Sequence, residues 1–230
     1  MALQIEVRCD KIEEKTIDRG MEMKQRIEVV AALIQRVKNG RKEILIAQRP
    51  KTKSNALLWE FVGGKIEADE TKEEALIREC REELGMSVLP YEVYYETFHE
   101  YPDVFVHLTI FKTSVLDGIP TMIEHSDLRW VSPFETDDFP FCPADTELLK
   151  KLQYEYATEQ ISIGKWRHFK GMEYEVIGIA KHSETLEPFV VYRALYGEGM
   201  IWTRPARMWM EIVERDGNRF PRFTYIGDQL

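Results

Sequence analysis

The chain contains little cysteine, no long apolar run and no excess of positive charge. Its three cysteines, Cys9, Cys80 and Cys142, are odd in number and far apart, which argues against a disulfide framework and against a zinc site. No apolar segment approaches the roughly 18 residues that span a bilayer. Charged residues also interrupt the N-terminus where a signal peptide has its apolar core. We therefore expect a cytoplasmic protein without a membrane partner.

Charge sets a second limit on function. The 230 residues carry 40 acidic and 31 basic side chains, which gives a formal net charge of -9. A surface of that sign repels phosphate unless a cation or a local basic patch intervenes. Nucleic acid is therefore not an expected partner, and a ligand that carries phosphate would need a bound metal.

Three regions differ in composition. Residues 1–25 are highly charged and form an N-terminal extension to which we assign no function. Residues 26–159 alternate strand-like and helix-like patterns and predict one α/β domain. Within it, Asn39-Gly40 between two β-branched runs predicts a hairpin. The expected strands are residues 27–37, 43–48, 91–101, 104–116 and 128–132, and a helix capped by Asp145 or Thr146 is expected to end near residue 160.

Residues 160–230 shift to an aromatic, β-rich composition broken by glycine, proline and charged turns. This pattern predicts a second, small all-β unit, which we expect to be barrel-like. The sequence of residues 164–225 resembles a small bacterial domain of unknown function, which implies no activity. Its aromatic and cationic side chains either form core and surface, or form a site for a nucleotide or a nucleic-acid strand.

Capping signals bracket a helix near residue 80. Thr71 and Glu74 have capping-box spacing and Gly85 is a C-terminal stop, so we predict a helix from Lys72 to Leu84. At about 100° per residue, the side chains of this helix divide into two faces. The apolar face, expected in the core, contains Leu76, Ile77, Cys80 and Leu84. The opposite face contains Glu79, Glu82 and Glu83, with only Ala75 among them.

Three carboxylates on one helical face repel one another. Each like-charged pair at this spacing destabilises an isolated helix by about 0.2 to 0.5 kcal/mol. Either the face is solvated, or a cation binds to it. Carboxylate oxygens on one rigid element suit Mg²⁺ or Mn²⁺, and the Gly63-Gly64 pair upstream leaves backbone carbonyls and amides approachable.

The wider spacing favours the cation. Seven residues stand at fixed distances from one another: Gly64, Glu70, Arg78, Glu79, Glu82, Glu83 and Gly85. At roughly 7% per residue, chance agreement is on the order of 10⁻⁸ per window. This pattern resembles the box of the Nudix hydrolases. Over about Ile27 to Tyr156 the chain further resembles the MutT-type members, through the motifs AQR, WEFVGGKIE, HEYPD, IEHSDLRWV and FCPAD.

The resemblance implies a fold and a set of site residues. The fold is an α/β/α sandwich with a mixed sheet. The implied metal ligands are the carbonyl of Gly63 and the side chains of Glu79, Glu82 and Glu83, with Glu124 as a further ligand or base. Arg78 would pair with Glu70 or with a box carboxylate to hold the loop and helix together. The implied substrate-binding residues are Arg49 and Lys65 for the triphosphate, Phe61 for the base pocket, Asp145 for the base edge and Asp103 near the nucleotide.

The implied activity is Mg²⁺-dependent, or Mn²⁺-dependent, hydrolysis of nucleoside or deoxynucleoside triphosphates to a monophosphate and pyrophosphate, in the service of nucleotide-pool housecleaning. The choice between 8-oxo-dGTP and cytidine nucleotides stays open at this level. So do a hydrolase acting on ADP-ribose-type substrates and a module that senses nucleotides without turnover. A homodimer is left open, as is the number of metal ions. Water activation by a metal requires no histidine, so His99, His107 and His125 are assigned no catalytic role.

Overall fold

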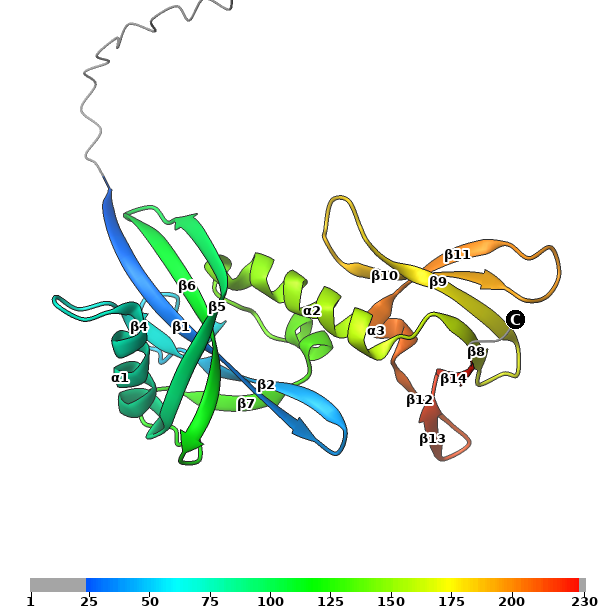
Figure 1. Cartoon of the computed structure of the whole chain (residues 1–230), viewed down its shortest axis with the longest axis horizontal. Helices are drawn as coiled ribbons and strands as arrows, with labels where there is room; N and C mark the ends of the chain where they lie inside the picture. Colours follow the sequence, from blue (N-terminus) through cyan, green and yellow to red (C-terminus); the bar gives the residue numbers. More distant parts are fainter. Residues whose placement is uncertain (1–23, 228–230) are drawn as a thin grey trace, which may run out of the picture.

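Two β-sheets and a helix that passes between them define the architecture (Figure 1). The computed structural model describes residues 24–227, so the N-terminal extension expected at residues 1–25 lies outside the described residues except for its last two positions. The first sheet precedes helix α2 (Thr146–Gln160) in the chain, and the second sheet follows it. None of the described helices is long and apolar enough to cross a membrane.

The hairpin expected at Asn39-Gly40 is present. Strands β1 (Gln25–Lys38) and β2 (Arg41–Gln48) pair antiparallel with Lys38 opposite Arg41, which leaves a two-residue loop. Asn39 and Gly40 have φ angles of 53° and 74°, so both central residues of the turn are left-handed. This turn matches the right-handed twist of the flanking strands, which explains why the dipeptide located it correctly.

The first sheet is mixed, as the resemblance implied. Its strands follow the order β3-β2-β1-β6-β5, with β4 paired to β1 and β7 paired to β2. Strand β1 runs parallel to β6, whereas the other pairs are antiparallel. The remaining strands are β3 (Trp59–Glu60), β4 (Gly63–Lys65), β5 (Ser87–Glu100), β6 (Val104–Asp117) and β7 (Asp127–Val131).

Strand β1 lies inside this sheet and is buried on both faces. Val30, Ala32 and Ile34 pack into one apolar cluster, while Ala31 and Leu33 pack into another. This alternation is the period of two of a β-strand. The first cluster includes the apolar face of α1, and the second includes Leu148, Leu149 and Leu152 of α2. Two helices therefore cover opposite faces of the sheet, which is the expected sandwich.

Helix α1 (Lys72–Leu84) has the predicted bounds and caps. The Thr71 side chain accepts from the backbone N–H of Glu74, the Glu74 side chain accepts from the N–H of Thr71, and Gly85 has a φ of 68°. Leu76, Cys80 and Leu84 are fully buried. Ile77, by contrast, is only half-buried, and Ala75 on the carboxylate side is fully buried. The helix is thus rotated so that part of its acidic face also points into the molecule.

Helix α2 belongs to the cores of both sheets. It follows two short 3-10 helices, Pro133–Asp138 and Pro143–Asp145. Asp145 occupies the predicted N-cap position, but its side chain makes no capping hydrogen bond. At the other end of α2, Tyr156 and Ala157 pack in one cluster with the aromatic residues of the second sheet. Phe134, from the first 3-10 helix, meets Tyr156 edge to face at 5.0 Å within that cluster.

The second sheet is open, so the barrel-like expectation was wrong. Its five strands follow the order β11-β10-β9-β8-β14, and among the described residues the end strands β11 and β14 do not pair. Side chains meet between these ends instead: the Arg204 guanidinium lies 5.7 Å from the ring centre of Phe223. The strands are β8 (Gly164–His168), β9 (Glu173–Lys181), β10 (Pro188–Ala194), β11 (Ile201–Pro205) and β14 (Phe223–Gly227).

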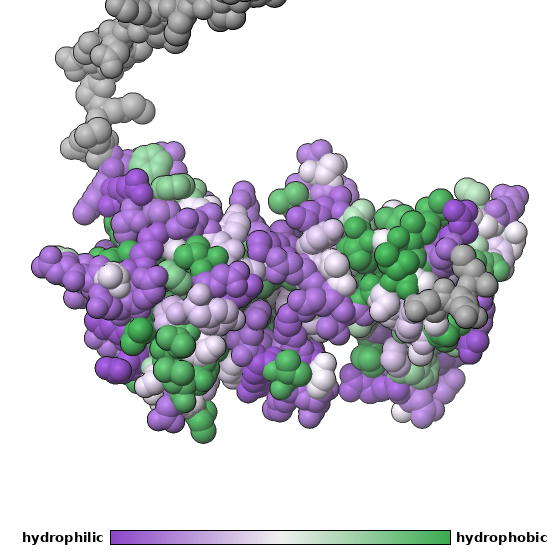
Figure 2. Space-filling view, viewed as in Figure 1, coloured by the Kyte–Doolittle hydropathy of each residue, from purple (hydrophilic) through white to green (hydrophobic). Residues whose placement is uncertain are grey.

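A short helix and a hairpin complete this second unit. Helix α3 (Ala206–Trp209) places Trp209 at 1% exposure, where its ring stacks on Phe223 at 3.7 Å. Strands β12 (Ile212–Arg215) and β13 (Asn218–Pro221) form a separate two-stranded sheet. Figure 2 shows apolar surface gathered over the second sheet, whereas the surface of the first unit is mostly polar. Aromatic side chains of this unit form a buried core cluster, which contains Trp166, Tyr174, Tyr192, Trp209 and Phe223.

Because α2 joins the two cores, we predict that truncating its shared ring destabilises both units together. Tyr156→Ala removes a buried ring and should lower the free energy of unfolding by about 3 kcal/mol. Tyr154→Ala is the matched control, since Tyr154 lies on the same helix but is only half-buried. Scanning calorimetry of the full chain measures both changes. Equal effects of the two variants would contradict a shared core at Tyr156.

Candidate active site

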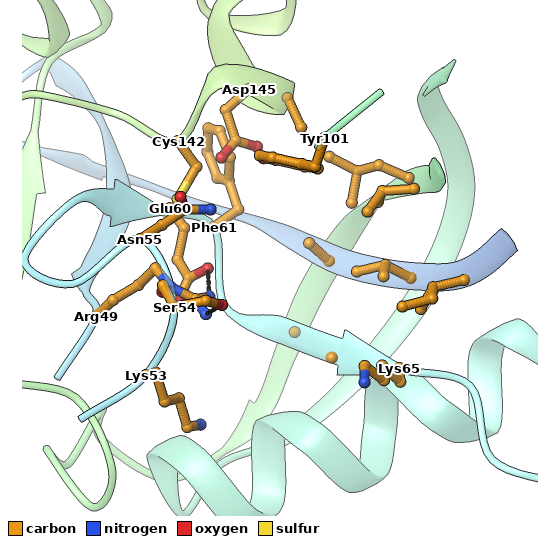
Figure 3. A pocket seen from close by; sticks show the side chains of 18 of the residues that line it. Arg49, Lys53, Ser54, Asn55, Glu60, Phe61, Lys65, Tyr101, Cys142 and Asp145 are labelled. Atoms are coloured by element: carbon orange, nitrogen blue, oxygen red, sulfur yellow. Dashed lines mark hydrogen bonds and ion pairs between the residues drawn. The ribbon is translucent and has the colours of Figure 1, made fainter. Parts of the chain in front are cut away.

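A cavity of about 830 Å³ opens beside α1, between β1, β4 and the loops that follow β2 and β5. Figure 3 shows Asp145 and Tyr101 at one end, with Lys53 and Lys65 toward the other. Glu79 and Glu83 line the cavity from α1. The predicted residues on its wall are Arg49, Phe61, Gly63, Lys65, Glu79, Glu83, Asp103 and Asp145. The other three predicted residues, Arg78, Glu82 and Glu124, do not line the cavity. They are linked to it by hydrogen bonds and ion pairs with neighbouring side chains.

The glycine pair of β4 allows α1 to approach the sheet. A Cβ on Gly63 would stand 2.0 Å from the Val30 carbonyl oxygen, and one on Gly64 would stand 2.2 Å from a carboxylate oxygen of Glu79. Gly63, which faces backbone, therefore excludes any side chain, whereas a side chain at Gly64 would force the Glu79 carboxylate to move. Val62 is fully buried, and its carbonyl accepts from a backbone N–H of β1. Packing and pairing therefore hold this segment beside β1.

Arg78 joins the acidic helix to the loop before it. Its guanidinium donates to both carboxylate oxygens of Glu70, at 3.1 and 2.7 Å. It also donates to Glu79 at 2.8 Å, to Glu82 at 3.2 Å and to the Lys65 carbonyl at 3.0 Å. The predicted pairing of Arg78 with Glu70 is therefore present. A planar guanidinium has five N–H donors in a fixed fork, which suits this bridging position.

Glu83 is a buried carboxylate with little compensation of its charge. Its side chain is 7% exposed, and its buried Oε2 atom has no hydrogen-bond partner in the part of the chain that the structure describes. Burial raises the pKa of Glu83 from its ordinary value of 4.5 to about 7, although the nearby charges of His125 and Lys53 oppose the shift. Two basic side chains stay beyond hydrogen-bond distance: the Lys53 ammonium lies 3.6 Å from Oε1, and Nε2 of the His125 imidazole lies 3.6 Å from Oε2. Glu83 is therefore a poorly solvated carboxylate with incomplete charge compensation.

Three neighbours of the cavity were assigned no role from the sequence. His125 is buried, and its Nε2 lies 3.7 Å from Glu60 and 3.6 Å from Glu83. Glu60 pairs with Arg49 at 2.5 Å. Lys53 pairs with Glu124 at 2.7 Å, and through this ammonium Glu124 approaches Glu83. The positions of Glu60 in WEF and of His125 beside Glu124 were the only sequence signals for these residues.

The opposite end of the cavity combines an aromatic ring with a buried acid. Phe61 is 3% exposed and lies 6.0 Å from the ring of Phe141. Asp145 is 4% exposed; burial, together with the charge of Glu60, raises its pKa well above the ordinary 3.8, against the opposing charge of Arg49. This carboxyl is therefore protonated over a wider pH range than a surface aspartate.

The donor set suits a hard divalent cation. Among residues 24–227, no three His, Cys, Asp or Glu side chains converge closely enough to hold an ion by themselves. Mg²⁺ does not require such a cage, because it keeps several waters and takes one or two carboxylates together with substrate phosphate. Glu79 and Glu83 are two carboxylates on one cavity wall, and among residues 24–227 the buried Oε2 of Glu83 has no hydrogen-bond partner. The residues present therefore fit this ion.

The raised pKa of Glu83 predicts a pH-dependent stability. Between pH 4.5 and about 7 the folded protein holds a proton that the unfolded chain has released, so stability falls as the pH rises through this window. At pH 8 with EDTA, Glu83→Gln should be more stable than the unsubstituted protein by up to about 3 kcal/mol. Near pH 4 the two proteins should agree.

Urea unfolding at both pH values measures this difference. Glu73→Gln is the control, because Glu73 is an exposed glutamate on the same helix. A Glu83→Gln variant that gains no stability at pH 8 would show that the carboxylate is adequately solvated in the folded protein.

Comparison with known proteins agrees with this fold. Residues 27–152 match the NUDIX domain, and residues 164–225 match a family described as protein of unknown function (DUF1653). The chain is 43% identical over 124 residues to the CTP pyrophosphohydrolase of Escherichia coli K12, which covers 54% of this chain and 89% of that protein. It is 33% identical over 119 residues to the 8-oxo-dGTP diphosphatase of the same organism, covering 51% and 91%.

A solved structure shares the arrangement of the first unit. The crystal structure of the MutT protein from Methanosarcina mazei superposes with a TM-score of 0.52 at 26% identity, covering 58% of this chain and 97% of that one. The NUDIX match covers more than half of the chain and includes α1 with its glycine pair and carboxylates. The chain therefore belongs to the Nudix hydrolase family.

Proposed function

We propose that the chain hydrolyses nucleoside or deoxynucleoside triphosphates with Mg²⁺, or Mn²⁺, to a monophosphate and pyrophosphate. This proposal rests on one observation, the different chemistry of the two ends of one cavity. Glu79 and Glu83 lie at its α1 side, while Phe61 and Asp145 lie at the far end. A nucleotide can span these ends, with its polyphosphate beside α1 and its base against the aromatic ring.

The chain's own residues would act either as metal ligands or as groups that position those ligands. Glu79, Glu83 and the Gly63 carbonyl would hold the divalent ion, with Glu82 and Glu124 as further carboxylates nearby. When bound, the ion would supply neutralisation of phosphate charge and Lewis-acid activation. Arg78 would keep the carboxylates in position through its bonds to Glu70 and to the Lys65 carbonyl.

Three further residues of the cavity would lie beside the nucleotide in different roles. Lys65 is exposed on the cavity wall and would meet the polyphosphate. The Arg49 guanidinium is already occupied by Glu60 and by the Ser54 carbonyl at 2.7 Å, so its role would be to position Glu60 as much as to contact phosphate. Asp103 lines the cavity in the turn between β5 and β6, where it would lie beside the nucleotide.

Asp145 supports a cytidine substrate over 8-oxo-dGTP. A protonated carboxyl offers one donor and one acceptor. The pairing edge of cytosine offers the complement, an exocyclic amine donor beside a ring-nitrogen acceptor. The same edge of guanine presents two adjacent N–H donors, which an ionised carboxylate would accept better. The raised pKa of Asp145 favours the first arrangement, and the relative that is 43% identical is named for CTP.

A substrate panel tests the proposed activity. Purified protein with Mg²⁺ should release pyrophosphate from CTP or dCTP with a higher kcat/KM than from 8-oxo-dGTP or ADP-ribose. Glu79→Gln should lower kcat at least about 100-fold, because it removes a proposed ligand of the activating ion. Glu73→Gln, on the same helix but away from the cavity, should leave kcat unchanged.

The possible results separate the alternatives. Turnover of ADP-ribose alone would replace the proposal with a diphosphate-type hydrolase. Nucleotide binding without turnover by any member of the panel would indicate a sensing module. Equal rates for Glu79→Gln and the unsubstituted protein would remove the carboxylates from the mechanism.

The pH dependence of KM tests the role of Asp145. As the pH rises through the pKa of Asp145, the carboxyl loses its donor, so KM for CTP should increase. Asp145→Asn keeps one acceptor and one donor at every pH and should lack this increase. Asp145→Ala should have a raised KM throughout. Parallel profiles for the aspartate and asparagine forms would contradict base recognition by a protonated carboxyl.

A further inference from the structure

Two cationic side chains neutralise the carboxylates around α1. Arg78 contacts Glu79 and Glu82, and Lys53 contacts Glu124 at 2.7 Å and approaches Glu83 at 3.6 Å. Of the two, only Lys53 lines the cavity. It comes from the loop after β2, far in sequence from the acidic helix, and the ammonium extends toward α1 in Figure 3.

The two cations are held very differently. Arg78 is fixed by two bonds to Glu70, one to each of Glu79 and Glu82, and one to a backbone carbonyl. Lys53 has one short contact, with Glu124, and the side chains of that pair are 44% and 46% exposed. Ion pairs with this exposure contribute little to stability. The ammonium of Lys53 can therefore leave its position easily, whereas Arg78 cannot.

The backbone of the Lys53 loop is anchored. Arg49 donates its backbone N–H to Leu58 and its Nε to the Ser54 carbonyl, and the N–H of Lys53 donates to Pro50. Arg49 itself is paired with Glu60. Movement of Lys53 would therefore occur in its flexible four-carbon side chain and not in the loop. The side chain stays at the cavity wall wherever its ammonium points.

We infer that Lys53 is a placeholder cation, which partly neutralises Glu83 and Glu124 when no metal is bound. When a divalent cation takes this place, the Lys53 side chain rotates and its ammonium contacts the substrate polyphosphate. This inference rests on the proposed function, because it names a phosphate-bearing substrate. It adds to that proposal a phosphate contact, Lys53, and a competition between a side chain and the metal.

Electrostatics supports both halves of the inference. A divalent cation beside Glu83 would repel the nearby ammonium and satisfy the same carboxylate oxygens, so Lys53 would lose its attraction to them. A polyphosphate in the same cavity would offer several anionic oxygens within reach of the Lys53 ammonium. Lysine suits the exchange, since its ammonium is a compact point charge with rotatable donors and needs no fixed geometry.

Two readouts with opposite signs test Lys53. In the absence of nucleotide, Lys53→Ala removes a competing positive charge, so Mn²⁺ should bind about threefold to tenfold more tightly, as measured by electron paramagnetic resonance of free Mn²⁺. In steady-state assays with CTP and saturating Mg²⁺, the same variant should raise KM about tenfold and change kcat much less. Lys53→Gln should behave like Lys53→Ala, because it also lacks the charge.

Lys51→Ala is the matched control. Lys51 is an exposed lysine two residues away on the same loop, and the structure gives it no ion pair among the described residues. This variant should leave both Mn²⁺ affinity and KM unchanged. If it reproduced the effects of Lys53→Ala, general loss of loop charge would explain the data and the placeholder role would be overturned.

Each remaining outcome decides one part of the inference. Unchanged or weaker Mn²⁺ binding by Lys53→Ala would overturn the placeholder role. An unchanged KM in a variant that turns over CTP would overturn the phosphate contact. If the unsubstituted protein hydrolysed no nucleotide, the proposed function would fail, whereas the Mn²⁺ measurement would still decide whether Lys53 competes with a cation.

Discussion

Repulsion among carboxylates is the constraint on which the rest of the site depends. Glu79, Glu82 and Glu83 share one helical face, and burial of Glu83 raises its pKa to about 7. Arg78 relieves the repulsion at Glu79 and Glu82, but at Glu83 the Lys53 ammonium stays 3.6 Å away. A protein gains no stability from such an arrangement. It does gain an electrostatic potential that favours a cation at one point of the cavity.

The packing of β4 and of the two helices holds these carboxylates against the sheet. Gly63 lets the backbone of β4 approach Val30 at a separation that no side chain would permit, and Gly64 leaves room for the Glu79 carboxylate. The two faces of β1 then place α1 on one side of the sheet and α2 on the other. Asp145 stands at the start of α2 without capping it, so its carboxyl stays free to enter the cavity. The same two helices that complete the core thereby supply both ends of the site.

The second unit is tied to the first through packing. Tyr156 and Ala157 of α2 share a cluster with Trp209 and Phe223, and Arg207 pairs with Asp138 at 2.7 Å across the boundary. The first unit is strongly acidic, whereas the second is nearly neutral, so charge alone would not hold them together. A shared aromatic core gives them a fixed relation, although the cavity lies entirely within the first unit.

Local signals in the sequence determined the elements of the fold. Thr71, Glu74 and Gly85 located α1 because caps are formed by residues close in the chain, and Asn39-Gly40 located the first hairpin for the same reason. The spacing from Gly64 to Gly85 identified the family. Only the tertiary structure decided the rest. It brought Lys53 and His125 to Glu83 and engaged Arg49 with Glu60. It also left β11 and β14 at the ends of an open sheet, where they do not pair with each other within residues 24–227. These are contacts between distant residues, and no local pattern encodes the burial and geometry that select them.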